Sequence, residues 1–157
     1  MELAAQPPRS RLRAVTSLYD TVVRALATLT PLLDFVVRYW LAEAFFKSGL
    51  TKIASWDTTI ALFENEYAVP LLPPEIAAYL GTATELAIPV LLVLGLFTRP
   101  AALVLFVFNI IAVISYPDLS EGGIKDHVYW GLLLLVTLFH GPGKLSVDHL
   151  IRTKFSA

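Results

Sequence analysis

The feature that most constrains this chain is an apolar run from Ile76 to Phe97 that carries a single charge, Glu85. At about 1.5 Å per residue, a helix of this length crosses the roughly 30 Å hydrocarbon core of a bilayer. The next run, Ala101–Tyr116, is uncharged and almost as long. Because 56% of the 157 residues are hydrophobic and 16% are charged, too little polar surface remains to coat a soluble domain. We therefore predict a membrane protein.

Two further segments are apolar enough to span. Thr30–Phe46 carries Asp34, Arg38 and Glu43, and Ile124–His140 is a shorter run with an apolar centre. With these segments the prediction is an all-α membrane protein, an antiparallel bundle of four transmembrane helices. The same reading divides the chain into a cytoplasmic tail with a surface helix (1–29), a four-span membrane domain (30–143) and a cytoplasmic C-terminal surface helix (144–157).

Short amphipathic helices at the membrane surface are predicted at three places. Before the first span, one helical stripe is apolar, namely Leu12, Val15, Tyr19, Val22, Leu26 and Leu29. In the first outer loop the apolar residues recur at helical spacing, as Trp56, Ile60, Phe63 and Tyr67, with Asp57 as a cap. At the C-terminus, Ser146 is expected to cap a helix that turns Val147, Leu150, Ile151 and Phe155 to the lipid. For the first of these helices, binding to a partner protein is the alternative.

The distribution of Lys and Arg predicts the orientation. Eight basic residues lie before the first span, in the second turn or after the last span: Arg9, Arg11, Arg13, Arg24, Arg99, Lys144, Arg152 and Lys154. The other side has Lys47, Lys52 and Lys125. The positive-inside rule therefore places both termini in the cytoplasm.

Glu85 needs a partner, because an unpaired carboxylate is costly inside a bilayer. Ala77, Gly81 and Glu85 recur at i, i+4 and i+8, so the carboxylate shares a face with small residues that admit a neighbouring helix. If Thr30–Phe46 runs outward, Arg38 lies at a depth similar to that of Glu85. We therefore predict a buried polar core of Arg38 and Glu85, with Asn109 on the third span as a third member.

Two alternatives stay open for these charges. Asp34 precedes Arg38 by four residues and Glu43 precedes Lys47 by four, so each basic residue has an acidic neighbour on its own helix. That pairing would leave Glu85 alone, in which case Glu85 would be a proton carrier rather than a structural residue.

Three blocks of the sequence resemble the DoxX family of small four-helix membrane proteins. They are "RYWLAEAFFKSGLTKIASW", "TATELAIPVLLVLGLFTRPAALVL" and "DHVYWGLLLLVTLFHGPGKLSVDHLI". The matching positions are Arg38, Phe46, Gly49, Lys52, Glu85, Gly95, Arg99, Ala101, His127, Trp130, Gly141, Gly143, Ser146 and Asp148. The resemblance implies a protein of the bacterial or archaeal plasma (inner) membrane. It also implies an association with sulfur oxidation through quinone-reducing complexes, with oxidative or thiol stress, or with metal stress.

The residue types limit the chemistry of the chain itself. Because it has no Cys, it carries no thiol chemistry and ligates no iron–sulfur cluster. His127 and His140 lie about 20 Å apart along one helix, with His149 beyond, which disfavours a metal or haem site. No catalytic residue, metal site or nucleic-acid partner is predicted, since the basic residues lie where topology requires them.

Three classes of function follow. The first is a non-catalytic membrane subunit or anchor for a redox or stress enzyme, partnered by that enzyme or by further copies of itself. The second is a quinone-linked oxidoreductase subunit, with a head-group pocket at the outer face; quinone is then the one cofactor considered. The residues expected at such an outer-face ligand site are Glu43, Lys47, Lys52, Trp56, His127 and Trp130. The third is an export helper for a small solute or metal-binding peptide.

Overall fold

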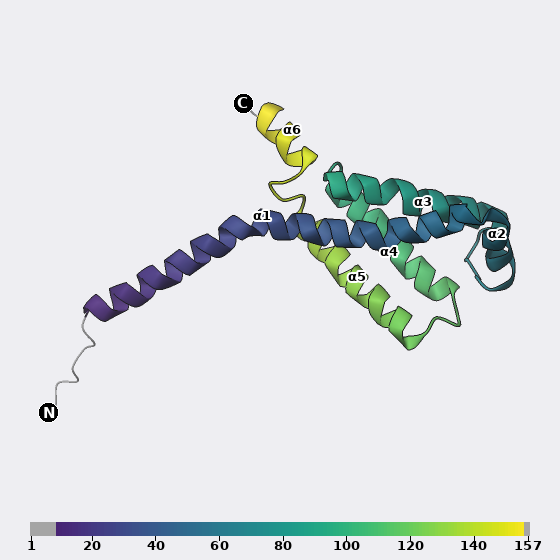
Figure 1. Cartoon of the computed structure of the whole chain (residues 1–157), viewed down its shortest axis with the longest axis horizontal. Coiled ribbons are helices and arrows are strands. Elements are labelled where there is room, and N and C mark those ends of the chain that lie inside the picture. The colour runs from purple at the N-terminus through teal and green to yellow at the C-terminus, as the bar shows by residue number, and fades with distance from the viewer. Residues whose placement is uncertain (1–8, 156–157) are drawn as a thin grey trace.

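The computed structural model describes residues 9–155, and within them all regular structure is α-helical (Figure 1). The six helices are α1 (Arg9–Ala54), α2 (Trp56–Asn65), α3 (Pro74–Leu94), α4 (Thr98–Ser115), α5 (Glu121–His140) and α6 (Val147–Phe155). The all-helical prediction is confirmed. Among the described residues, α3 and α4 are the two helices long and apolar enough to cross a membrane by length and composition.

The first helix differs from the prediction of a surface helix followed by a separate span. α1 runs unbroken for 46 residues, about 70 Å, with Pro31 inside it. Every described side chain from Arg13 to Leu29 is exposed, so this part forms an arm that extends past the bundle (Figure 1). Pro31 lacks an N–H and so removes one hydrogen bond of the helix, and α1 continues through it. Of the predicted segment 1–29, residues 1–8 and the side chain of Leu12 lie outside the described part.

The turn between α3 and α4 is short because a glycine ends α3. Gly95 has a φ of +67°, the left-handed conformation that glycine adopts without a Cβ penalty. Its N–H bonds to the carbonyl of Leu92, and the N–H of Leu96 bonds to that of Leu91. At the other end of α3, Pro74 occupies the first turn, where no N–H donor is needed. α3 and α4 are therefore antiparallel neighbours.

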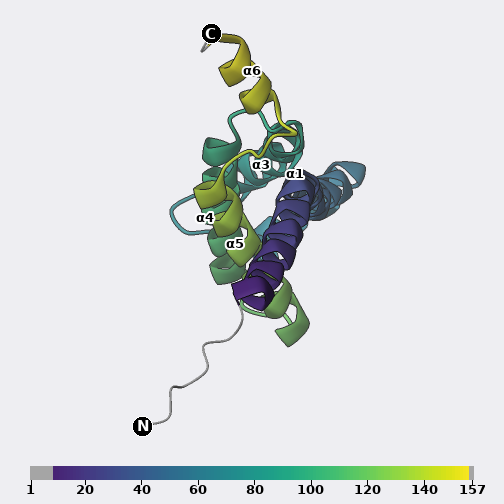
Figure 2. The same cartoon turned by 90° about the vertical axis from the view of Figure 1, so that its left-hand side faces the viewer.

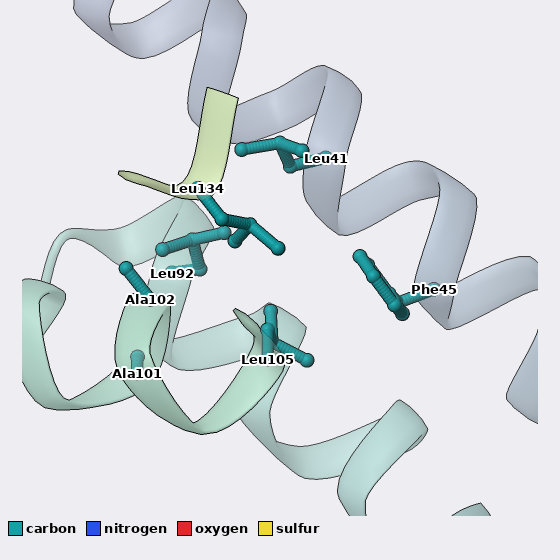
Figure 3. Packing of buried hydrophobic residues seen from close by; sticks show 7 residues of the cluster. All are labelled: Leu41, Phe45, Leu92, Ala101, Ala102, Leu105 and Leu134. Carbon is teal, nitrogen blue, oxygen red and sulfur yellow. The ribbon is translucent and has the colours of Figure 1, made fainter. Parts of the chain in front are cut away.

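The main core lies where α1, α3, α4 and α5 meet (Figure 3). Its buried residues are Leu41, Phe45, Leu92, Ala101, Ala102, Leu105 and Leu134. A smaller cluster of Phe63, Ala77 and Ala78 packs α2 against α3. A helix thus occupies the predicted part of the loop, although Ser55 rather than Asp57 precedes α2 and neither side chain caps it.

α2 and α6 lie at opposite ends of the bundle (Figure 1). We refer to these as the α2 end and the α6 end. The predicted cap of the last helix is confirmed, since Ser146 Oγ accepts a hydrogen bond from the N–H of His149 at 3.2 Å. Figure 2 shows α6 standing away from the bundle, beyond the turn that joins α3 to α4.

Candidate functional site

A cavity of about 450 Å³ lies between α3 and α4 at the α2 end, within the range of small-molecule sites. Its walls are chiefly apolar and come from α2, α3, α4 and the loops after α2 and α4. They include Phe63, Val69, Leu72, Ala77, Leu80, Gly81, Phe108, Ile111, Ala112 and Leu119. The polar lining is confined to Ser48, Lys52, Tyr67, Thr84, Glu85, Ser115, Tyr116 and His127. A few convergent polar groups in an apolar concavity are typical of a ligand site.

Glu85 lies deep in this cavity and forms an ion pair with Lys52. Lys52 Nζ donates to both carboxylate oxygens, at 2.6 and 2.8 Å, and to Ser48 Oγ at 3.0 Å. Ser48 Oγ in turn donates to Glu85 Oε1 at 3.0 Å. Since Glu85 is 4% exposed, its charge is compensated almost entirely by these two side chains of α1.

The predicted pair between Arg38 and Glu85 is therefore wrong. Arg38 and Glu85 are both buried, as expected, but they lie at different levels of the bundle. The prediction placed Arg38 and Glu85 at similar depths in the membrane because it ended the first span at residue 46, whereas α1 continues to Ala54. A Cβ on Gly49 would lie 3.1 Å from Glu85 Cβ, so Gly49 is level with the carboxylate. Arg38 lies eleven residues earlier, about 16 Å along the helix.

Arg38 instead binds backbone carbonyl groups at the α6 end. It donates to the carbonyls of Leu92 and Val93, at the end of α3, at 3.2 and 3.1 Å. It also donates to the carbonyls of Leu145 and Asp34. A guanidinium with five donors thus satisfies the carbonyl groups that a helix C-terminus leaves free.

The local alternative is correct for one of its two pairs. Lys47 Nζ lies 2.6 Å from Glu43 Oε1, in an exposed pair one helical turn apart. The Asp34 carboxylate, in contrast, lies 3.7 Å from His140 Nε2, while Arg38 bonds to the backbone of Asp34.

Asn109 is buried as predicted, but it binds His127 instead of the two charged residues. Asn109 Nδ2 donates to the carbonyl of His127 at 2.9 Å, and Asn109 Oδ1 lies 2.7 Å from His127 Nδ1. Because a carbonyl only accepts, the amide nitrogen must face it, and the amide oxygen must face the ring. His127 Nδ1 therefore carries the proton. The ring also packs edge-on against Trp130, with centroids 4.9 Å apart.

We call the part of the cavity near Tyr67, Ser115 and Tyr116 its mouth. Ser115 in this part was not singled out from the sequence. Ser115 is 4% exposed, and its Oγ has no hydrogen-bond partner within residues 9–155. The carbonyl of Ser115 accepts the N–H of Ala68 at 2.8 Å, which holds the loop after α2 to the end of α4. Tyr67 packs edge-on against Tyr116 there, and burial, reinforced by Tyr116 and by nearby carboxylates, raises the pKa of the Tyr67 phenol. A serine at the end of an apolar helix carries no sequence signal of this role.

The residues predicted for an outer-face ligand site fall into three groups. Lys52 and His127 line the cavity described above. Glu43, Lys47 and Trp130 line a shallower groove between α1 and α5, together with Trp40, Asp126 and Tyr129. Trp56 contacts neither and packs on Tyr79 of α3, with ring centroids 4.6 Å apart. The structure thus brings two of the six residues to the enclosed cavity.

At the α6 end, Asp148 ties α6 to the start of α4. Its carboxylate accepts the N–H groups of Phe97 and Thr98 and the hydroxyl of Thr98, each at 2.9 Å. The N–H of Asp148 bonds to the carbonyl of Gly95, also at 2.9 Å. Burial raises the pKa of Asp148, but the hydrogen bonds from Thr98 and Phe97 and the nearby Arg152 outweigh it and lower the pKa overall. The carboxylate therefore caps α4 from a different helix.

Eight of the fourteen positions named in the family resemblance thus gather in two groups. Gly49, Lys52, Glu85 and His127 are at the cavity. Arg38, Gly95, Ser146 and Asp148 are at the α6 end, where a Cβ on Gly95 would collide with Arg38 Nη1 and Ser146 Cβ. Among the described residues there is no group of three or more His, Asp or Glu side chains suited to a metal.

Comparison with known proteins agrees with this arrangement. The family model described as DoxX matches residues 33–117, which is more than half of the chain. A Haemophilus influenzae protein called "Uncharacterized protein" is 32% identical over 126 residues, covering 74% of this chain and 82% of its own. Inner membrane protein YphA of Escherichia coli is 31% identical over 130 residues, covering 75% of this chain and 89% of its own. No solved structure matches.

The matched region contains most of the site. Residues 33–117 hold Arg38, Ser48, Lys52, Glu85 and Asn109, whereas His127, Ser146 and Asp148 follow it. On the extent of this match and the identity to both relatives, this chain is a membrane protein of the DoxX family.

Proposed function

We propose that this protein is a membrane subunit of a redox or stress-response system that binds a lipophilic small molecule in the cavity at the α2 end. A quinone in its reduced, quinol form is the first ligand to test, because it combines an apolar body with phenolic hydroxyl groups. In this proposal the chain holds the ligand and a partner protein performs the chemistry. The alternative function of an export helper for a small solute or metal-binding peptide is not favoured by any feature of the cavity.

The observation that carries the proposal is a buried ion pair inside an apolar cavity. Burying Lys52 and Glu85 costs several kcal/mol per ion, and such a pair adds little net stability. An apolar pair of the same volume would hold the bundle equally well. A cavity of about 450 Å³ that keeps these charges is better explained by recognition of a ligand.

The absence of cysteine supports the assignment of chemistry to a partner, because the chain lacks thiols for sulfur redox steps. We propose that the α1 arm is a contact site for that partner or for a second copy. Its exposed apolar side chains include Val15, Leu18, Tyr19, Val22, Leu26 and Leu29. The prediction from the sequence, that this part lies in the membrane surface, requires the arm to bend away from the axis of α1.

We also propose the four-span topology with both termini in the cytoplasm. In this orientation the α6 end, with Arg99, Lys144, Arg152 and Lys154, is cytoplasmic, and the α2 end opens to the outer face. The cavity would then be filled from the outer leaflet or from the outer aqueous phase.

The test is to purify the protein in mild detergent and identify co-purified quinones and lipids by mass spectrometry. Ala112→Phe should fill the cavity and displace the ligand, since Ala112 lines it. Val107→Phe is the matched control, because Val107 is on the same helix, 47% exposed and outside the cavity lining. Equal ligand content in wild type, Ala112→Phe and Val107→Phe would refute the proposed site.

A further inference from the structure

We propose that the cavity at the α2 end selects apolar molecules that carry a hydrogen-bond donor, such as a phenolic hydroxyl, over molecules that carry only acceptors. This inference rests on the ligand-binding function proposed above and names the chemical class of the ligand. It follows from which hydrogen-bonding groups of the lining remain free.

The ammonium group of Lys52 has no proton left for a ligand. An ammonium donates three hydrogen bonds, and Lys52 Nζ already donates to Ser48 Oγ and to both oxygens of Glu85. The fixed cation of the cavity is therefore saturated by the protein. A ligand carbonyl placed beside it would have to break one of these charge-assisted bonds.

Glu85, in contrast, keeps acceptor capacity. Its Oε1 accepts from Lys52 and from Ser48, whereas its Oε2 accepts from Lys52 alone. Each carboxylate oxygen can accept two hydrogen bonds. One acceptor position of Oε2 is thus available to a ligand hydroxyl at the floor of the cavity.

His127 offers a second acceptor, because its contact with Asn109 fixes which ring nitrogen carries the proton. Because the Asn109 amide nitrogen binds the carbonyl of His127, the amide oxygen faces the ring and Nδ1 carries the proton. The described residues place no carboxylate within ion-pair distance of His127, so at neutral pH the ring is chiefly uncharged. Its Nε2 then presents a lone pair and has no partner among residues 9–155.

The hydroxyl groups at the mouth do not reverse this preference. Ser115 Oγ is buried and unpartnered, and a hydroxyl can donate or accept by rotating. Ser115 lies seven residues beyond Phe108 on α4, about 10 Å farther towards the mouth. Like the other hydroxyl groups of the lining, on Tyr67, Thr84 and Tyr116, it suits a polar group of either kind. The groups that cannot change character, Glu85 and the neutral ring of His127, only accept.

A ligand that has only hydrogen-bond acceptors would therefore be repelled at the positions where a ligand with a hydrogen-bond donor is bound. A carbonyl or ether oxygen facing Glu85 or His127 Nε2 would bring lone pairs together and leave buried acceptors unsatisfied. A hydroxyl at the same place forms a hydrogen bond to the neutral imidazole, or a stronger, charge-assisted one to the carboxylate.

The experiment compares two redox-inert probes that share an apolar tail, 4-heptylphenol and 4-heptylanisole. Binding to the full chain in lipid nanodiscs is measured by titration calorimetry, with empty nanodiscs subtracted for partitioning into lipid. We expect the phenol to bind about tenfold more tightly than its methyl ether, the factor supplied by one hydrogen bond to a strong acceptor. His127→Phe and Asn109→Leu should each reduce this ratio. His140→Phe, at the other end of α5 and outside the cavity lining, should leave it unchanged.

The outcomes separate the inference from the function on which it rests. If both probes bind but the ether binds as tightly as the phenol, the donor selection is refuted and the cavity role stands. If neither probe binds wild type above empty nanodiscs, the proposed function fails and the inference fails with it. Thermal melts establish whether each variant is folded. Where a variant is not folded, the ratio of phenol to ether affinity in the wild-type protein decides whether the cavity selects a donor.

Discussion

Lys52 Nζ lies 2.6 Å from Glu85 Oε2 and 2.8 Å from Oε1, so one lysine near the end of α1 holds both oxygens of the single charged residue in α3's apolar run. Ser48, one turn earlier on α1, completes the arrangement at 3.0 Å. This relationship links α1 to α3 and places the charged groups in the lining of the cavity.

The first prediction concerns this pair. Glu85→Gln leaves the Lys52 ammonium without its counter-charge and should lower the free energy of unfolding by roughly 3 kcal/mol, the low end for a broken buried pair because Lys52 is partly exposed. Adding Lys52→Met should recover a large part of this loss, a coupling of about 1–3 kcal/mol. Thermal melts in one detergent, on wild type, both single variants and the double variant, measure this coupling. Arg38→Gln is the control partner, and its coupling to Glu85→Gln should lie near zero.

The second prediction concerns the packing around Arg38. Gly95→Ala should destabilise the protein by several kcal/mol, since a Cβ there collides with Arg38 Nη1 and Ser146 Cβ at a φ of +67°. Gly122→Ala is the matched control, because the nearest atom to its new Cβ is Ser120 Oγ at 3.9 Å. Chemical denaturation in detergent should show a lower free energy of unfolding for Gly95→Ala and an unchanged one for Gly122→Ala. Equal losses in the two variants would contradict the close packing at the α6 end.

The third prediction concerns pH and the cap on α4. The hydrogen bonds that lower the pKa of Asp148 stabilise the fold while the carboxylate is ionised. Their contribution is fully present above the unfolded value of about 3.9 and is lost as the pH falls through the lower pKa of the folded state. Asp148→Ala should therefore cost about 1–2 kcal/mol at pH 7. Melting curves of wild type and variant should converge in strong acid; a constant difference at every pH would contradict the ionised cap.

The fourth prediction concerns topology, which Lys and Arg determine in our proposal. The chain has no Cys, so a single cysteine at Ser17 or Asp118 is an unambiguous label, and both side chains are exposed. In intact cells an impermeant thiol reagent should modify Asp118→Cys and leave Ser17→Cys unmodified until the membrane is opened. Modification of Ser17→Cys from outside would reverse the orientation.

Much of the fold could be predicted because the strong signals are local. The apolar runs gave α3 and α4, Ser146 gave the start of α6, and the spacing of Ala77, Gly81 and Glu85 gave the buried face of α3. The ends of α3, α4 and α5 differ from the predicted runs by up to three residues, which periodicity does not determine.

The partners of the buried polar residues could not be predicted, because they depend on register. The sequence does not reveal that α1 continues past residue 46 as one helix, and that extension moves Lys52 instead of Arg38 to the level of Glu85. The positions of Ser115 and Asp148 depend likewise on how α4 meets the loop after α2 and how α6 folds back. These are tertiary relationships, with no periodic pattern to mark them.

The most direct test of the account is where a ligand lies in the native membrane. A heptylphenol that carries a photoreactive diazirine on its tail, irradiated in membranes that contain the protein, should label the peptides around 67–72, 77–85 and 108–116, which line the cavity. Excess 4-heptylphenol should abolish this labelling, and Ala112→Phe should reduce it while Val107→Phe does not. Labelling confined to Trp40–Lys47 and Tyr129–Leu133, along the groove between α1 and α5, would contradict the account.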